Sequence, residues 1–250
     1  MISFSPEGYA AVLRAGLDAG YGFVPVGEAI AREGKTVALR HDVDFDLDHA
    51  RQMAEIETGL GVRSTYFVLM GCDFYAATDA AGRAAIAAIT DLGHEIGLHW
   101  DSSYIADAEQ AVDRVRRERD LLSAIVGKPV VSASQHVPTD SAYFDIESLF
   151  QVEAYSAAMR ERFTYVADSS MRWRAKTPLD LFAEGVDVQF NAHPVWWISQ
   201  GETADDKLRA LREVQAQRQS AEYERFIGYM NHVLANRDAY DRKFAEARAL

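Results

Sequence analysis

The feature that most constrains the fold of this chain is a regular alternation of strand-like and helix-like segments. Apolar runs rich in β-branched and aromatic residues predict strands at 36–44, 62–69, 94–99 and 129–134. Apolar residues at helical spacing predict helices between them, at 47–60, 80–92 and 104–126. Glycines such as Gly61 and Gly93 mark the joints. Because parallel strands need a crossover helix, this pattern predicts an α/β fold with a parallel sheet.

The rest of the chain extends this pattern into one domain. Ser5-Pro6 is a good helix start and predicts an N-terminal helix. Further strands are expected at 164–167 and 186–192, and the chain is mostly helical from about residue 203. A length of 250 residues is usual for a single α/β barrel. We therefore expect one domain over 1–250, with a core at about 36–197 and a helical extension at 203–250.

That helical extension carries an apolar stripe opposite a charged face. The residues of the stripe are Leu208, Leu211, Val214, Phe226, Ile227, Met230, Val233 and Leu234. We interpret the stripe as the packed face of a surface helix rather than as a membrane or partner helix.

Charge and composition exclude several classes of partner. The net charge is −12, so no basic patch is available for a nucleic acid or an anionic membrane surface. The single cysteine, Cys72, cannot form an internal disulfide. No basic segment followed by an apolar run opens the sequence, and no apolar run reaches the ~18 residues of a spanning helix. We expect a cytoplasmic protein; the sequence does not indicate its oligomeric state.

Polar residues gather where the predicted strands end, which is the edge at which parallel barrels build their sites. The first strand ends in His41-Asp42-Val43-Asp44, and alternation along the strand places Asp42 and Asp44 on one face. Two neighbouring carboxylates repel each other, and a bound cation relieves that repulsion. Alternatively, both carboxylates cap the following helix, where Asp46 and Asp48 also lie. The pattern alone leaves both interpretations open.

The third strand ends in a comparable cluster, Gly93-His94-Glu95-Ile96-Gly97-Leu98-His99-Trp100-Asp101. His99 and Asp101 share a face, and imidazole nitrogen with carboxylate oxygen suits zinc or a similar divalent metal. A lone histidine at a strand end is more often a structural residue, so the interpretation as a metal ligand also depends on the upstream Asp-x-Asp motif. Further polar residues follow later strands, in Gln135-His136-Val137-Pro138, Asp168-Ser169-Ser170 and Asn191-Ala192-His193. A histidine beside a metal can donate a proton to a leaving group.

Taken together, these segments resemble the polysaccharide deacetylase family, also called carbohydrate esterase family four, over roughly Val37 to Trp197. Leu39–Asp44 resembles its first motif in the Asp-x-Asp form, Gly93–His99 its second, and Ser64–Val68 the strand between them. The pattern looks closest to a divergent branch associated with surface-polysaccharide gene clusters. The resemblance implies a distorted (β/α) barrel of about seven strands. It also implies a divalent metal, usually zinc, and removal of acetyl groups from N-acetylated sugars.

Carried over by position, the resemblance implies roles for individual residues. Asp42 corresponds to the general base, Asp44 and His99 to metal ligands, and His193 to the general acid. Asp168, with Trp173 beyond it, resembles the segment that supports the base. The pair Trp196-Trp197, together with Trp100, is expected to provide apolar walls of the pocket.

Two positions depart from the family pattern. The second histidine ligand, four residues after the first, is replaced here by Ser103, which is a poor zinc ligand. Either Asp101 or His136 can complete the ligand set, and His136 is the residue that we assign. The family's arginine-proline motif is also absent, and His136-Val137-Pro138 stands near its place.

These observations lead to the hypothesis of a metal-dependent hydrolase that removes an acyl group, N-acetyl in the simplest case, from a sugar or glycan precursor. The expected partner is an acylated sugar or another small molecule. One alternative is an amidohydrolase that acts on another small C–N substrate, since one fold hosts many activities. A second alternative is a catalytically silent barrel that binds a glycan or a partner, and Ser103 is its best support.

Overall fold

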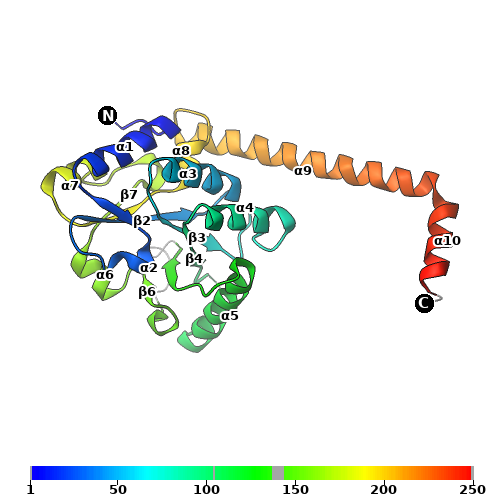
Figure 1. Cartoon of the computed structure of the whole chain (residues 1–250), viewed down its shortest axis with the longest axis horizontal. Helices are drawn as coiled ribbons and strands as arrows, with labels where there is room; N and C mark the ends of the chain where they lie inside the picture. Colours follow the sequence, from blue (N-terminus) through cyan, green and yellow to red (C-terminus); the bar gives the residue numbers. More distant parts are fainter. Residues whose placement is uncertain (1, 104, 137–143, 249–250) are drawn as a thin grey trace. The chain divides into compact units, whose positions relative to one another are not determined.

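The protein is built on one parallel sheet followed by a helical segment (Figure 1). The computed structural model describes residues 2–103, 105–136 and 144–248. The chain divides into two compact units, residues 1–207 and 208–250, which we call the body and the arm and describe separately. That all 250 residues act as one domain stays a prediction.

The strands and helices have the following bounds. The strands are β1 Gly22–Val24, β2 Thr36–Val43, β3 Thr65–Leu69, β4 Glu95–Trp100, β5 Ser132–Gln135, β6 Val152–Glu153, β7 Thr164–Ala167 and β8 Val188–Asn191. The helices of the body are α1 Pro6–Asp18, α2 Val26–Ala29, α3 Leu47–Gly59, α4 Ala80–Asp91, α5 Ala108–Val126, α6 Ala157–Arg162, α7 Pro178–Glu184 and α8 Pro194–Ile198. Two 3-10 turns, η1 Glu147–Leu149 and η2 Ser169–Met171, lie between them. Helix α9 is Ala204–Ala235 and α10 is Arg237–Ala247.

The sheet has the order β6-β5-β4-β3-β2-β8-β7, and β1 pairs with the first residues of β2. Every pairing is parallel. The crossover helices pack along the outside of the strands, α3 against α4 and α4 against α5 (Figure 1). The sheet therefore curls into a half-barrel with helices around it, which confirms the predicted distorted barrel with a helical C-terminal extension.

Helix caps explain most of the observed element bounds. The Ser5 hydroxyl accepts a hydrogen bond from the Gly8 amide at 3.1 Å, as the predicted start of α1 requires. Helix α5 begins at Ala108, later than predicted, because the Asp107 carboxylate caps it. Tyr104, the predicted first residue of that helix, lies outside the described residues. The Asp46 carboxylate accepts from the His49 amide at 2.9 Å and so caps α3. Asp42 and Asp44 are therefore not the N-cap of that helix.

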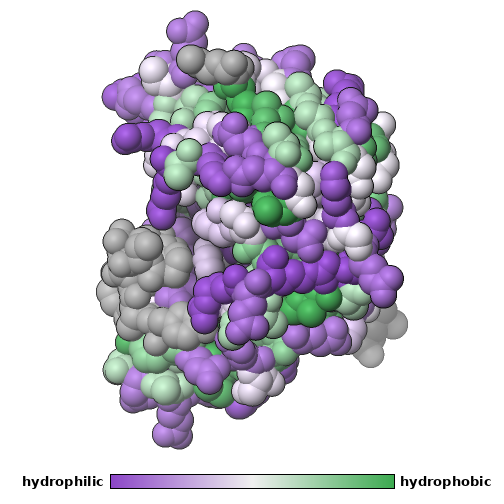
Figure 2. Space-filling view, turned by 90° about the vertical axis from the view of Figure 1, so that its left-hand side faces the viewer, coloured by the Kyte–Doolittle hydropathy of each residue, from purple (hydrophilic) through white to green (hydrophobic). Residues whose placement is uncertain are grey.

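The surface of the body is mixed. Figure 2 shows one face of it, on which hydrophilic residues separate smaller hydrophobic areas.

The apolar stripe of the helical extension differs from its prediction, because Leu211 alone among its eight predicted residues is buried. The stripe is thus largely exposed, where the sequence had suggested a packed face. Every helix of the described ranges is too short or too polar to cross a membrane.

Behind the sheet, a buried carboxylate ties several elements together. Glu57 of α3 is fully buried, and its Oε1 lies 2.6 Å from Nε2 of His41 on β2. The same carboxylate accepts the hydroxyl of Tyr9 on α1, and its Oε2 accepts the Ser64 hydroxyl at 2.5 Å. The second histidine of this cluster, His94, places Nδ1 3.3 Å from Glu57 Oε2. A side chain of α3 thereby holds α1 and three neighbouring strand segments in register.

This cluster predicts that the protein loses stability in mild acid. Burial lowers the pKa of His94 below its ordinary value of 6.5, so the unfolded chain takes up a proton there before the folded chain does. Burial acts to raise the pKa of Glu57, but His41 and the neighbouring donors outweigh it and lower that pKa below 4.5. Both shifts make the free energy of unfolding fall as the pH falls, first below about 6.5 and again below about 4.5.

Urea unfolding measured between pH 7.5 and 4 tests this expectation. The same pH dependence in the unmodified protein and in a variant that lacks the His94 imidazole would contradict it. The His94→Gln variant should lose the first of the two decreases and keep the second, because only the titrating imidazole is removed.

Candidate metal and catalytic site

Three side chains that could hold a metal ion meet at the carboxyl ends of the strands. Asp44 follows β2, His99 lies in β4, and His136 follows β5. Nε2 of His99 lies 3.4 Å from Asp44 Oδ1, and Nδ1 of His136 lies 3.5 Å from the same oxygen. The two histidine nitrogens are 3.2 Å apart. Strand β3 lies between β2 and β4 in the sheet. The curl of the sheet therefore brings these donors together.

The spacing of these donors fits a tetrahedral cation. Ligand bonds of about 2.0–2.1 Å place neighbouring donors of a tetrahedral zinc site about 3.3–3.4 Å apart. Asp44 Oδ1 is buried and accepts no hydrogen bond from any residue that the structure describes. Nδ1 of His99 lies 2.8 Å from the Ser134 carbonyl, which can only accept, so Nδ1 donates that hydrogen bond and Nε2 is the nitrogen that faces Asp44. The donor set therefore fits a divalent metal, with a fourth position left for water or substrate.

The electrostatics keep Asp44 ionised. Burial acts to raise the pKa of its carboxyl, but the neighbouring His136 and His99 outweigh that effect and hold the pKa well below its ordinary value. The result is a permanent negative charge at the centre of three converging strand ends. Such a charge attracts a cation and disfavours an anion.

Asp42 lies beside this cluster and is held from two sides. Nη2 of Arg40 donates to its two oxygens at 2.9 and 2.6 Å, and Nδ2 of Asn191 donates to Oδ2 at 2.9 Å. Asp42 Oδ2 is 3.9 Å from His99 Nε2. Burial acts to raise the pKa of Asp42, but Arg40, followed by His99 and His193, outweighs it and lowers that pKa. Asp42 is thus an ionised, oriented carboxylate next to the donor set.

His193 also lies next to Asp44 and forms a pair with Asp168. Nδ1 of His193 lies 2.5 Å from Asp168 Oδ1, while Nε2 points toward the cluster, 3.9 Å from Asp44 Oδ2. The indole of Trp197 donates to Asp168 Oδ2 at 2.6 Å. Burial acts to lower the pKa of His193, but Asp168 and the other carboxylates raise it to about 9. The imidazole is therefore protonated near neutral pH and can act as a proton donor.

The structure places the other predicted residues in different ways. Asp168 contacts His193 rather than the Asp42 that it was expected to support. Asp101 accepts the Ser103 amide at 2.8 Å and is not among the three clustered donors. Val137 and Pro138, which stand near the place of the family's arginine-proline motif, lie outside the described residues.

The predicted aromatic walls lie mostly inside the body. Trp100 and Trp197 are fully buried, and Trp196 is 6% exposed. Trp173 stacks on Phe4 and also contacts Trp197. Of these rings, Trp197 contacts the site through its hydrogen bond to Asp168, and Trp196 contacts Phe45, the residue after Asp44.

Arg40 and Asn191 are the site residues to which the sequence pattern assigned no role. Arg40 is fully buried, and its guanidinium also donates to the Ser134 hydroxyl at 2.6 Å. The sequence did contain a signal for Arg40. An arginine two positions before an aspartate on a buried strand lies on the same face as that aspartate, and a buried arginine needs a carboxylate partner.

Comparisons with known proteins find distant likenesses in structure. No family model and no curated protein matches the sequence. Peptidoglycan deacetylase PdaC from Bacillus subtilis is 15% identical with a TM-score of 0.46, over 74% of this chain and 85% of that one. Deacetylase PplD from Streptococcus pyogenes is 14% identical with a TM-score of 0.47, over 82% and 86%. BA3943 from Bacillus anthracis, a CE4 family pseudoenzyme, is 14% identical with a TM-score of 0.45, over 72% and 62%.

Proposed function

We propose that this protein is a metal-dependent hydrolase that removes an acyl group, N-acetyl in the simplest case, from a sugar or glycan precursor. Asp44, His99 and His136 would hold the metal, for which zinc is the best fit to two imidazoles and one carboxylate. The observation that carries the proposal is the spacing of 3.2 to 3.5 Å among these three donors, with Asp42 and His193 each 3.9 Å from one of them. The substrate class comes from the two motifs, which resemble those of polysaccharide deacetylases.

The residues around the cluster divide the chemistry among them. A bound divalent cation supplies polarisation of the acyl oxygen and a lowered pKa for water. Asp42 is the general base that takes a proton from the attacking water, and Arg40 and Asn191 fix its orientation. His193 donates the proton on Nε2 to the departing amine. Asp168 on Nδ1 stabilises the charged imidazole and holds its tautomer.

Metal uptake and acetate release, measured on the same samples, test this proposal. We expect one divalent ion per chain after incubation with Zn²⁺ or Co²⁺, and acetate release from N-acetylglucosamine oligosaccharides that stops on chelation. The His136→Ala variant should bind metal at least about 100-fold more weakly and lose acetate release, because a ligand is removed.

Asp101→Asn is the matched control, since Asp101 was the other candidate for the third ligand and contacts the Ser103 amide instead. It should bind metal as the unmodified chain does. Loss of metal in Asp101→Asn and not in His136→Ala would reverse the assignment of the third ligand. A folded chain that takes up neither ion would overturn the hydrolase proposal and favour the catalytically silent barrel.

A further inference from the structure

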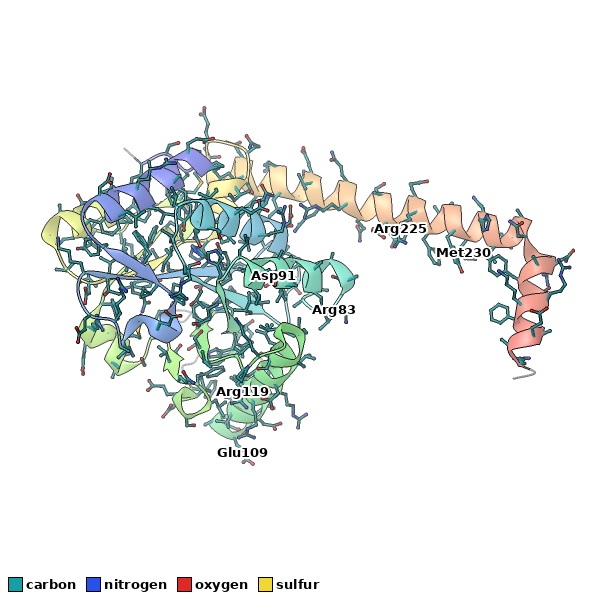
Figure 3. The ribbon with its side chains drawn as sticks, in the orientation of Figure 1. Arg83, Asp91, Glu109, Arg119, Arg225 and Met230 are labelled. Carbon is teal, nitrogen blue, oxygen red and sulfur yellow. The ribbon has the colours of Figure 1, made fainter. Side chains whose placement is uncertain are left out.

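An exposed aromatic side chain lies in the loop that leads from β3 to α4. It belongs to Phe74, which is 53% exposed, more than any other large hydrophobic side chain that the structure describes in the body. Helix α4 follows this loop, with Arg83 near its start and Asp91 at its end (Figure 3). An aromatic ring carries a large apolar area, so a ring held in water beside a site is available to a ligand.

The loop is tied to the end of β2, which carries the metal-binding carboxylate. The Tyr75 hydroxyl donates to the Val43 carbonyl at 2.7 Å, and Cys72 Sγ donates to the Asp44 carbonyl at 3.3 Å. The Phe74 amide in turn donates to Cys72 Sγ at 3.4 Å. The residues on both sides of Phe74 are therefore anchored beside Asp44, which fixes where the exposed ring lies relative to the cluster.

Phe74 is also the outer member of a row of three aromatic rings. Its ring centroid lies 5.0 Å from that of Phe45, which lies 6.3 Å from that of Trp196. Phe45 directly follows Asp44 in the chain, and Trp196 comes three residues after His193. Trp196 is buried and Phe45 is half-buried, so Phe74 offers the most surface to a ligand. The row borders both the metal donors and the proposed general acid.

The charges around this ring favour an uncharged ligand. Asp73 precedes Phe74 and is exposed, and Asp101 follows β4 at the same edge of the sheet. With the ionised Asp44, these carboxylates disfavour an anion such as a phosphate. One face of a pyranose ring carries mainly C–H groups, which pack against an aromatic ring, while its hydroxyls stay in water. A neutral sugar ring thus fits both the aromatic surface and the negative charge beside it.

We propose that Phe74 stacks against a pyranose ring of the substrate, so that the substrate class is an uncharged N-acylated glycan rather than a small acyl amide. This inference rests on the proposed function, because it takes the cluster at Asp44 to act on a sugar. The stacked ring does not change during hydrolysis, so the contact binds substrate and transition state equally. Its loss should raise KM roughly 10-fold and leave kcat unchanged.

Titration of the full chain with a trisaccharide of N-acetylglucosamine tests this contact directly. The Asp42→Asn background is used so that the ligand is not consumed. Phe74→Ala and Phe74→Leu should each bind the trisaccharide roughly 10-fold more weakly, whereas Phe74→Trp should bind it at least as well as the unmodified residue does. Leucine keeps an apolar side chain without a flat face, so it separates stacking from simple apolar contact. Metal uptake should be equal in all these variants, because the donors are unchanged.

Leu121→Ala is the matched control. Leu121 is 48% exposed on α5, two residues after Arg119 (Figure 3), in the half of the helix that leads to the start of β5. This variant should bind the trisaccharide as the unmodified protein does. Unchanged affinity in Phe74→Leu would overturn the stacking and indicate an apolar contact, such as one to an acyl chain. Lack of binding by the unmodified residue at about 10 mM trisaccharide would overturn it too. The titration needs no turnover, so failure of acetate release would count against the hydrolase proposal alone.

Discussion

Replacing Asp42 by asparagine is expected to lower the rate of acyl-group hydrolysis by about 10²–10⁴-fold, the usual contribution of a general base. The amide of asparagine preserves the size of the side chain but cannot accept a proton from water at neutral pH. Metal binding should be retained, because the donors are Asp44, His99 and His136. Turnover and metal content measured on one preparation separate loss of the base from loss of the ion.

Asp48→Asn provides a control with the same chemical change. Asp48 lies in the first turn of α3 and pairs with Arg51 at 2.8 Å, outside the site. Its rate should equal that of the unmodified protein. Full activity in Asp42→Asn would show that a group other than Asp42 accepts the proton from water. Loss of metal from that variant would instead make Asp42 part of the ligand set.

Replacing Glu57 by alanine is expected to produce the largest loss of stability, about 3–5 kcal/mol, as removal of one partner from a buried ion pair does. Glu57 is fully buried and accepts from His41, Tyr9, Ser64 and Tyr66. The variant would leave all of these groups without their acceptor. For a chain of this size the melting temperature should fall by roughly 10 °C or more.

Glu55→Ala is the matched control, two residues away on the same helix. Its side chain is 52% exposed and forms a surface ion pair with Arg51. Exposed pairs of this kind contribute about 0–1 kcal/mol, so the melting temperature should change little. Thermal unfolding followed by circular dichroism measures both variants. A Glu57→Ala variant that melts within a degree or two of the unmodified protein would show that the cluster is not a stabilising element.

The sequence predicted the bounds of several elements closely. Strand β7 was predicted with its exact bounds, and β2, β4 and α4 within a residue or two. Strands β1 and β6 were not predicted, because three and two residues are too few to show a periodicity. Their positions are fixed by pairing with β2 and β5, which is a property of the assembled sheet.

In the candidate site, too, some residues could be predicted from the sequence and others depend on the assembled sheet. Asp42, Asp44 and His99 are visible in the sequence because each is a polar residue at the end of an apolar strand. Whether Asp101 or His136 is the third donor depends on how far the sheet curls. The sequence could not decide this, because the periodicity of side chains describes each strand separately. The pairing of His193 with Asp168 joins the ends of two adjacent strands, β7 and β8, 25 residues apart in the chain. The motif resemblance alone had suggested a different partner for Asp168.

The carboxylate behind the sheet has a consequence for how this protein can diversify. Glu57 ties His41 of β2 to Ser64 and His94, which lead into β3 and β4. At the other end of β2, Tyr75 donates to the Val43 carbonyl at 2.7 Å and Cys72 lies 3.3 Å from the Asp44 carbonyl. Asp44 is therefore anchored at both ends of its strand, so Glu57, Cys72 and Tyr75 should tolerate less drift in evolution than the exposed Asp73 between them.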